Sequence, residues 1–219
     1  MNLSTSEENY IKSIYHLQLE SNLVNTNTLA RELNTKAASV TDMLKKLKTK
    51  KLVKYERYYG FKLNETGTRV ALRIIRRHRL WEHFLVSKLD FEWDEVHVIA
   101  EELEHVSSPE LIKKLDSYLG KPKIDPHGDP IPDVDGKLPV IKQINLFDLP
   151  LQKPATVSSV SNQSPQMLDM LKHYGIGIGS QIKITKNFHF DHSLEIKVSK
   201  QAACVISQQV AKNIFVYHD

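Results

Sequence analysis

The sequence predicts an α+β multidomain protein: a winged helix-turn-helix, a helical domain and a C-terminal SH3-like small β-barrel. Three patterns lead to this fold class. Three helical segments precede two short strands, two further helices repeat His and Glu, and strand-like runs fill the last third of the chain. We expect domains at residues 1–72, 73–140 and 151–219, with a linker at 141–150.

Composition limits the class of protein. The 219 residues carry a formal charge of +4, which is only mildly basic. The single cysteine, Cys204, excludes an intrachain disulfide and favours a reducing compartment. The polar start has no signal-peptide core, and no apolar run reaches the length of a membrane span. We therefore expect a cytoplasmic protein with no membrane partner.

The first domain is predicted from capping signals and helical periodicity. Ser6 is the expected N-cap of the first helix, and Thr26 or Asn27 that of the second. A short helix, a tight turn and a longer helix make a helix-turn-helix, and the two strands after it make a wing. The expected helices cover residues 6–20, 28–33 and 37–50, and the expected strands cover 52–57 and 60–63.

Lysines concentrate between Lys36 and Lys54, where Asp42 is the only acid. Such a basic patch is typical of a surface that neutralises phosphates, although a solvated helix end would also be rich in lysine. Short side chains at the start of the third helix would allow it to approach base edges closely. The candidate DNA-binding residues are Thr28, Lys36, Ala38, Ser39, Thr41, Lys45 and, at the wing tip, Arg57 and Tyr58.

Two helices carry candidate metal ligands. His97, Glu101, Glu104 and His105 share one helical face because they are spaced three, four, seven and eight residues apart. About twenty residues earlier, His78 and Glu82 form another pair at i, i+4. Imidazoles and carboxylates so grouped suggest a divalent metal, and the alternative is a solvated acidic face.

The long helix from residue 64 to about 89 has an apolar stripe containing Trp81, Phe84 and Leu85. A small winged domain cannot cover this stripe, and a homodimer interface explains it. We therefore expect residues 73–140 to form a helical dimerisation domain.

The last part of the chain changes character at a Pro- and Gly-rich passage, from Gly120 to about Pro150. Beyond it, five short strands and one helix at 165–174 predict the SH3-like barrel. The expected strands lie at residues 155–157, 181–184, 194–198, 203–206 and 214–217.

Three stretches follow one another in this chain: Arg77 to Glu82, Val96 to Ser107, and His127 to Pro132. With the winged helix and the small barrel, they resemble the diphtheria-toxin-repressor family of metal-dependent transcriptional regulators, over nearly the whole chain. The resemblance implies a homodimer, two metal centres per subunit and metal-activated binding to palindromic operators. It further implies a repressor of metal-uptake genes rather than an enzyme.

Carried over by position, the resemblance implies two ligand sets. Iron-responsive members place a cysteine where this chain has Glu101, and manganese-responsive members place a glutamate. A hard carboxylate suits Mn²⁺, so we expect manganese, with Fe²⁺ as the alternative and Zn²⁺ or Co²⁺ as possible substitutes. The first set is His78, Glu82 and His97; the second is Glu101, Glu104 and His105, with Asn9 near it.

The first helix departs from the family pattern at two positions. Asn9 stands where the family has a methionine or aspartate ligand, and it offers only a neutral amide oxygen. The second acidic ligand of the manganese type falls on Lys12, which cannot coordinate a metal while charged. Two separated centres are therefore expected, rather than a compact binuclear site.

Two other classes of function are compatible with parts of the pattern. A metallohydrolase could use the His and Glu cluster, but the chain has no His-Glu-x-x-His motif and no candidate nucleophile near it. A metal-independent DNA-binding or protein-interaction module would have a merely solvated acidic face. We expect no enzyme activity.

Overall fold

The computed structural model describes residues 2–21, 23–56, 60–106, 108–199 and 201–217. The chain forms two compact units that interleave along the sequence. Because they interleave, the boundaries predicted at residues 72, 140 and 150 stay predictions. Within the described ranges, no helix combines the length and hydropathy needed to cross a bilayer. The first unit comprises Met1–His78, Glu101–Ile112 and Pro132–Leu138; the second comprises Arg79–Ala100, Lys113–Ile131 and Pro139–Asp219.

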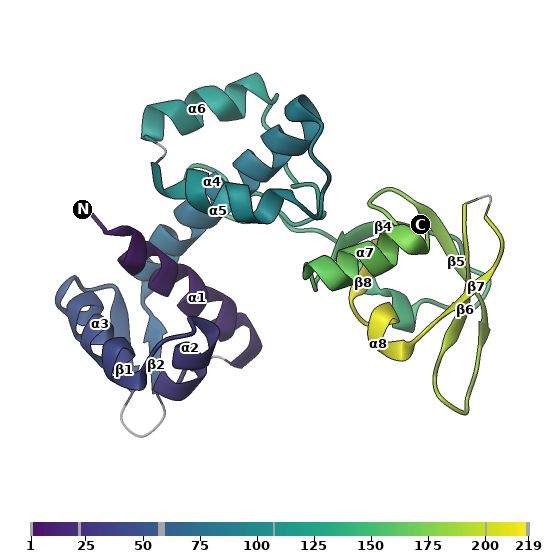
Figure 1. The fold of residues 1–219 in the computed structure, drawn as a ribbon, viewed down its shortest axis with the longest axis horizontal. Coiled ribbons are helices and arrows are strands. Elements are labelled where there is room, and N and C mark those ends of the chain that lie inside the picture. Colours follow the sequence, from purple (N-terminus) through teal and green to yellow (C-terminus); the bar gives the residue numbers. More distant parts are fainter. Residues whose placement is uncertain (1, 22, 57–59, 107, 200, 218–219) are drawn as a thin grey trace. The chain divides into compact units, whose positions relative to one another are not determined.

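The first unit contains the predicted winged helix-turn-helix (Figure 1). The two strands pair antiparallel with Val53 opposite Leu63, and Val24 adds an isolated bridge to Phe61. Ile11, Ile14, Leu29, Val40 and Leu47 are fully buried, so all three helices contribute to one core. The elements are α1 (Thr5–Ser21), α2 (Thr26–Glu32), α3 (Ala37–Thr49), β1 (Val53–Glu56) and β2 (Gly60–Leu63).

The N-caps of α1 and α2 differ from those predicted. Ser4, not Ser6, caps α1: its hydroxyl accepts from the Glu7 amide, and the Glu7 carboxylate accepts from the Ser4 amide. This reciprocal pair is a capping box, which satisfies two backbone donors and fixes the start two residues earlier. For α2 the cap is Asn25, whose side-chain oxygen accepts from the Thr28 amide.

The next three helices are α4 (Glu65–Leu89), α5 (Val96–Val106) and α6 (Pro109–Tyr118). The first two run across the boundary between the units. Helix α5 starts at Val96, after a turn at residues 93–95. The Trp93 ring packs against the core of the second unit and its carbonyl accepts a hydrogen bond from His127, so it is held outside the helix.

The second unit contains one six-stranded antiparallel sheet, in the order β3-β8-β4-β5-β6-β7. Its five predicted strands and the predicted helix are present, and the structure adds the edge strand β3, a 3-10 turn and a second short helix, α8, which were not predicted. Helix α7 starts at Ser164, whose hydroxyl accepts from the Met167 amide. The elements are β3 (Ile144–Asn145), the 3-10 turn η1 (Leu146–Asp148), β4 (Ala155–Val160), α7 (Pro165–His173), β5 (Gln181–Asn187), β6 (Leu194–Val198), β7 (Cys204–Ile206), α8 (Gln208–Ala211) and β8 (Ile214–Tyr217).

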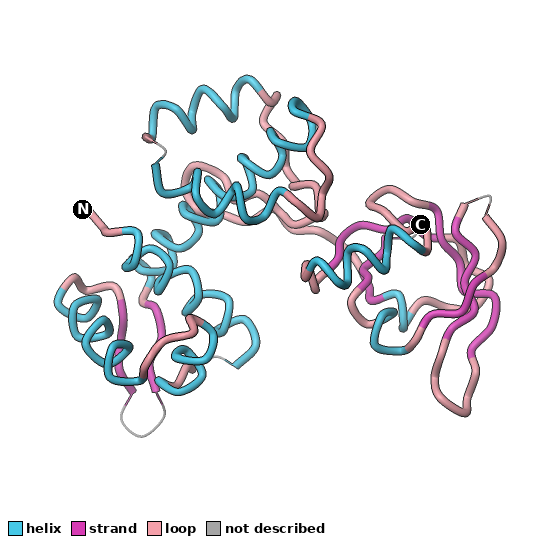
Figure 2. Tube along the Cα trace, viewed as in Figure 1, coloured by secondary structure: helices cyan, strands magenta, loops and turns pink. Residues whose placement is uncertain are grey.

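Alternate residues of these strands point into one hydrophobic core. Ile182 and Ile184 of β5, for example, are buried, and Leu168 and Leu171 of α7 close the core from the helix side. The register shifts within the β4–β8 and β5–β6 pairs, as β-bulges do when they bend a sheet. Figure 2 shows the long loop from α6 to β3, which carries the Pro-rich stretch.

Candidate functional site

Helix α3 presents an exposed polar face. Lys36, Ala38, Ser39, Thr41 and Lys45, all predicted to meet DNA, are exposed. The Thr41 hydroxyl donates to a backbone carbonyl of its own helix at 3.0 Å, and Lys45 pairs with an exposed acid at 3.0 Å. Exposed pairs of this kind contribute little to stability. The lysine ammonium therefore stays available to a phosphate.

The remaining predicted DNA contacts lie on α2 and the wing. Thr28 is half-buried, and its hydroxyl lies 3.1 Å from Asn25 Oδ1 in the cap of α2. Arg57 and Tyr58, predicted for the wing tip, lie outside the described residues. Their predicted role therefore stays a prediction.

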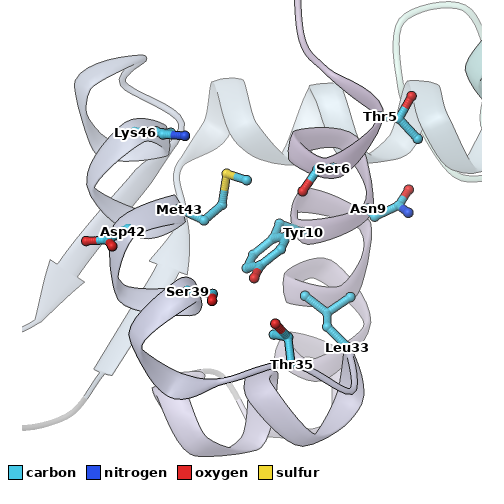
Figure 3. A pocket seen from close by; sticks show the side chains of 10 residues that line it. All are labelled: Thr5, Ser6, Asn9, Tyr10, Leu33, Thr35, Ser39, Asp42, Met43 and Lys46. Atoms are coloured by element: carbon cyan, nitrogen blue, oxygen red, sulfur yellow. The ribbon is translucent and has the colours of Figure 1, made fainter.

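A groove lies between α1 and α3, lined by Tyr10 from α1 and by Ser39, Asp42 and Lys46 from α3 (Figure 3). Figure 3 shows Asn9 on the side of α1 that points away from α3. The Asn9 Oδ1 atom is buried, and no residue in the described part of the chain hydrogen-bonds to it. Asn9 is nevertheless one of the residues that line this groove.

In the second unit, the buried carboxylate of Glu82 faces two imidazoles. His97 Nδ1 lies 3.4 Å from one carboxylate oxygen and His127 Nδ1 lies 3.8 Å from the other. The Glu82 side chain is 1% exposed whereas that of His97 is 55% exposed, so the group is open to solvent on the His97 side. His127 Nε2 donates to the Trp93 carbonyl at 2.7 Å, which turns Nδ1 towards Glu82.

Asp125 adds a second buried carboxylate to this group. One ligand atom each from Glu82, Asp125 and His127 can be chosen so that all lie within 4.8 Å of one another. Burial, together with the nearby Asp129 and Glu82 carboxylates, raises the pKa of Asp125 to about 7. Burial alone would lower the pKa of His127, but Glu82 and Asp125 raise it above its ordinary value. The excess of negative charge favours a cation, whether a proton or a metal ion.

Arg79 supplies part of the balancing charge. Its Nε atom lies 3.4 Å from Asp125 and its Nη2 atom 2.9 Å from Asp129. Gln163, in the loop before α7, donates its amide to Asp129 at 3.0 Å. Arg79 and Gln163 therefore hold the loop that carries Asp125 and Asp129 in place.

In the first unit, ligand atoms of Glu101, Glu104 and His105 also lie within 4.8 Å of one another. A lysine from α1 occupies the space between the two carboxylates. Lys12 Nζ lies 2.5 Å from Glu101 Oε2, and 2.8 and 3.0 Å from the two oxygens of Glu104. The predicted second ligand set is thus assembled around an ammonium group.

The imidazoles of the first unit have carboxylate neighbours of their own. His105 Nδ1 lies 2.7 Å from Glu8 Oε2, and His78 Nδ1 lies 2.7 Å from Glu104 Oε2. Arg77 also contacts Glu8, at 2.8 Å. These contacts join α1, α4 and α5 through charged groups.

Four members of these groups were not predicted in their roles: Glu8, Asp125 and His127 as parts of a site, and Lys12 as a partner of the predicted ligands. His127 did have a signal, because it begins one of the three stretches that carry the family resemblance, and Asp125 lies two residues before it. Glu8 is one helical turn before Lys12 on α1, and nothing in the sequence distinguishes it from a solvated acid.

Three family descriptions match consecutive parts of the chain. Residues 2–61 match the iron-dependent repressor N-terminal DNA-binding domain. Residues 64–133 match the iron-dependent repressor metal-binding and dimerisation domain, and residues 144–218 match the FeoA domain. The winged helix binds DNA, the helical region binds divalent metal and dimerises, and the sheet is a FeoA domain of SH3-like type.

Curated relatives cover the chain in part. The iron-dependent repressor IdeR of Mycobacterium leprae is 28% identical over 71% of this chain and 70% of its own length. An uncharacterised helix-turn-helix-type regulator of Methanocaldococcus jannaschii is 36% identical over 54% of this chain and 96% of its own. A "Probable metal transport system membrane protein" of Chlamydia trachomatis is 46% identical over 74 residues, and the chain spans only 16% of it.

Solved structures match over almost the full length. A manganese-dependent transcriptional repressor in complex with manganese is 33% identical, with a TM-score of 0.86, and the match covers 97% of this chain and 99% of that one. ScaR with bound Cd²⁺ is 29% identical, with a TM-score of 0.81 and the same coverage. These relatives are repressors and not enzymes, so the metallohydrolase alternative falls away. The chain belongs to the diphtheria-toxin-repressor family of metal-dependent, DNA-binding transcriptional repressors.

Proposed function

We propose that this chain is a manganese-activated repressor of metal-uptake genes that binds palindromic operators as a homodimer in the cytoplasm. The observation that carries the metal assignment is the buried Glu82 carboxylate, which faces His97 Nδ1 at 3.4 Å and His127 Nδ1 at 3.8 Å. Oxygen and nitrogen donors without sulfur suit Mn²⁺. The one thiol, Cys204, belongs to β7 and packs against the sheet core.

The donors around Glu82 fit a divalent cation. A carboxylate with 1% exposure is costly to bury unless a positive group compensates it. His97 is exposed, so an ion can enter from its side, and His78 precedes Glu82 by one turn of α4. We propose Glu82 and His97, two of the three predicted ligands, together with His127, which faces the other oxygen of Glu82. The third predicted ligand, His78, belongs to the first unit, where its Nδ1 lies 2.7 Å from Glu104 Oε2. A cation bound there would lie against this carboxylate and the two imidazoles that face it.

In the second predicted ligand set, Asn9 with Glu101, Glu104 and His105, the two glutamates already bind the Lys12 ammonium. The proposed metal response therefore depends on the first set.

The route from metal to DNA follows from the elements that carry the residues. The first set lies on α4 and α5, and α4 follows the wing strand β2 directly along the chain. We propose that metal stabilises the dimer arrangement in which two α3 helices fit adjacent major grooves, ~34 Å apart. Metal then acts by binding this arrangement more tightly than others.

Fluorescence anisotropy tests the proposal, with a palindromic duplex selected from a randomised pool. Mn²⁺, Fe²⁺ and Zn²⁺ are titrated in parallel, and Mn²⁺ should tighten DNA binding at least roughly tenfold. Glu82→Gln should lose this gain and keep the weak, salt-sensitive binding of the metal-free protein. Equal affinity with and without saturating Mn²⁺ would reject metal activation. A larger effect of Fe²⁺ would identify an iron(II)-responsive repressor instead.

A further inference from the structure

The Lys12 side chain reaches from α1 into the acidic face of α5. Its Nζ atom has three carboxylate oxygens at 2.5, 2.8 and 3.0 Å, one from Glu101 and two from Glu104. The Lys12 side chain is only 12% exposed, and the Glu104 side chain is fully buried. An ammonium has three N–H donors and no acceptor, so these contacts can use all of its hydrogen-bonding capacity.

This geometry does not fit a divalent metal at the same place. A metal ion would bind the same carboxylate oxygens, at distances of about 2.0–2.2 Å. It would then lie directly against the ammonium, where two positive charges repel strongly in a poorly hydrated site. The ion could enter only if the buried lysine left, and the structure shows Lys12 in place.

The neighbouring groups are also arranged around the ammonium. His105 Nδ1 is 2.7 Å from Glu8, and His78 Nδ1 is 2.7 Å from Glu104, so each imidazole has a nitrogen directed at a carboxylate. The buried Asn9 Oδ1 atom, which has no hydrogen-bond partner in the described part of the chain, is an uncharged oxygen that could offer a metal only a neutral ligand. One neutral oxygen ligand does not offset the repulsion between a metal ion and the Lys12 ammonium.

We propose that Lys12 is a tethered cation that takes the place of a divalent metal at the Glu101–Glu104–His105 group. This group then binds no divalent metal, and Lys12 holds α1 against α5 whatever the metal supply. The inference deepens the proposed function, on which it rests for the claim that one metal site per subunit, the Glu82 site, carries the regulation.

Metal stoichiometry tests the inference directly. Equilibrium dialysis of the full-length chain against Mn²⁺, followed by elemental analysis, should find one bound ion per subunit. Lys12→Glu replaces the ammonium with a third carboxylate, and Lys12→Met removes its charge while keeping an apolar stem. At least one of these variants should bind a second ion, and adding Glu101→Gln should remove that ion again. The control is Lys172→Met, because Lys172 also bridges two carboxylates, Glu92 at 3.0 Å and Asp94 at 2.6 Å. This variant should still bind one ion per subunit.

The outcomes separate this inference from the proposed function. Two ions bound to the unmodified chain, one of them lost in Glu101→Gln, would overturn the role of Lys12, and this result needs no lysine variant to fold. Folded Lys12 variants that gain no ion would overturn it as well. If the unmodified chain binds no Mn²⁺ while Lys12→Glu binds one, the proposed Glu82 site fails and the tethered cation stands.

Discussion

Glu104→Gln tests how strongly the buried ion pair holds the first unit together. The change keeps the size of the side chain but removes the charge that faces Lys12 at 2.8 and 3.0 Å. Removing one partner of a buried pair typically costs about 3–5 kcal/mol, because the other charge is left uncompensated. Lys12 keeps its Glu101 contact, so we expect the lower end of this range, about 3 kcal/mol. For a chain of this length, that loss lowers the melting temperature by roughly 6–12 °C.

The assay is thermal and urea unfolding followed by circular dichroism, with a chelator present so that metal does not contribute. Glu65→Gln is the control, because Glu65 pairs with Arg69 at 3.1 Å but is 86% exposed; it should change stability by less than about 0.5 kcal/mol. The double variant Lys12→Met/Glu104→Gln should lose less stability than the sum of the two single changes. Equal losses in Glu104→Gln and Glu65→Gln, or strict additivity in the double variant, would refute the reasoning.

Three further expectations concern other parts of the chain. Gly128→Ala should destabilise the second unit by about 2 kcal/mol or more, because Gly128 has φ +85° and an added Cβ would lie 1.8 Å from the Ser158 carbonyl oxygen. Gly120→Ala is the control: Gly120 also has a positive φ, but an added Cβ would meet no atom within 4 Å, so the same unfolding assay should find a smaller loss. Arg57→Ala should weaken binding to every duplex alike, whereas Ser39→Ala should change sequence preference, and binding arrays with selected and scrambled sites distinguish the two. A hydrogen bond from Lys50 lowers the pKa of Glu7 below its ordinary value of 4.5. The stability that Glu7 contributes is therefore complete above pH 4.5 and is lost as the pH falls through the lowered pKa. Urea unfolding between pH 3 and 6 should show that the stability of Glu7→Gln falls less steeply with acid than that of the unmodified chain.

Local chemistry explains why the order and type of elements could be predicted. Helix α6 shows such local signals at its start: the Ser108 hydroxyl accepts from the Leu111 amide, and Pro109 is the first residue of the helix. Strands β5 and β6 alternate buried residues with more exposed ones, which is also a local pattern. Ser4 and Ser6 compete as caps of α1, and Glu7 decides between them. Ser4 and Glu7 have the spacing of a capping box, which is also a local signal and could have identified Ser4.

The charged groups depend on contacts between distant segments. Lys12 and Glu104 are 92 residues apart in the chain, and His127 and Trp93 are 34 residues apart. Helical spacing correctly placed Glu101, Glu104 and His105 on one face, since that is a property of a single helix. Which cation faces them depends on how α1 packs on α5, and no periodicity within either helix contains that information.

A tethered ammonium and a diffusible metal ion can each neutralise carboxylates, but only the effect of the metal ion depends on its concentration in the cell. A diffusible ion stabilises the state it binds by RT ln(1 + [L]/Kd), which vanishes when the ion is scarce. The Lys12 ammonium is present at a fixed effective concentration, so the link from α1 to Glu104 persists without metal. Metal therefore need not supply that link. If metal binds as proposed, its differential affinity at the proposed Glu82 site must account for the whole change in DNA affinity, because a ligand shifts an equilibrium only as far as its preference for one state allows.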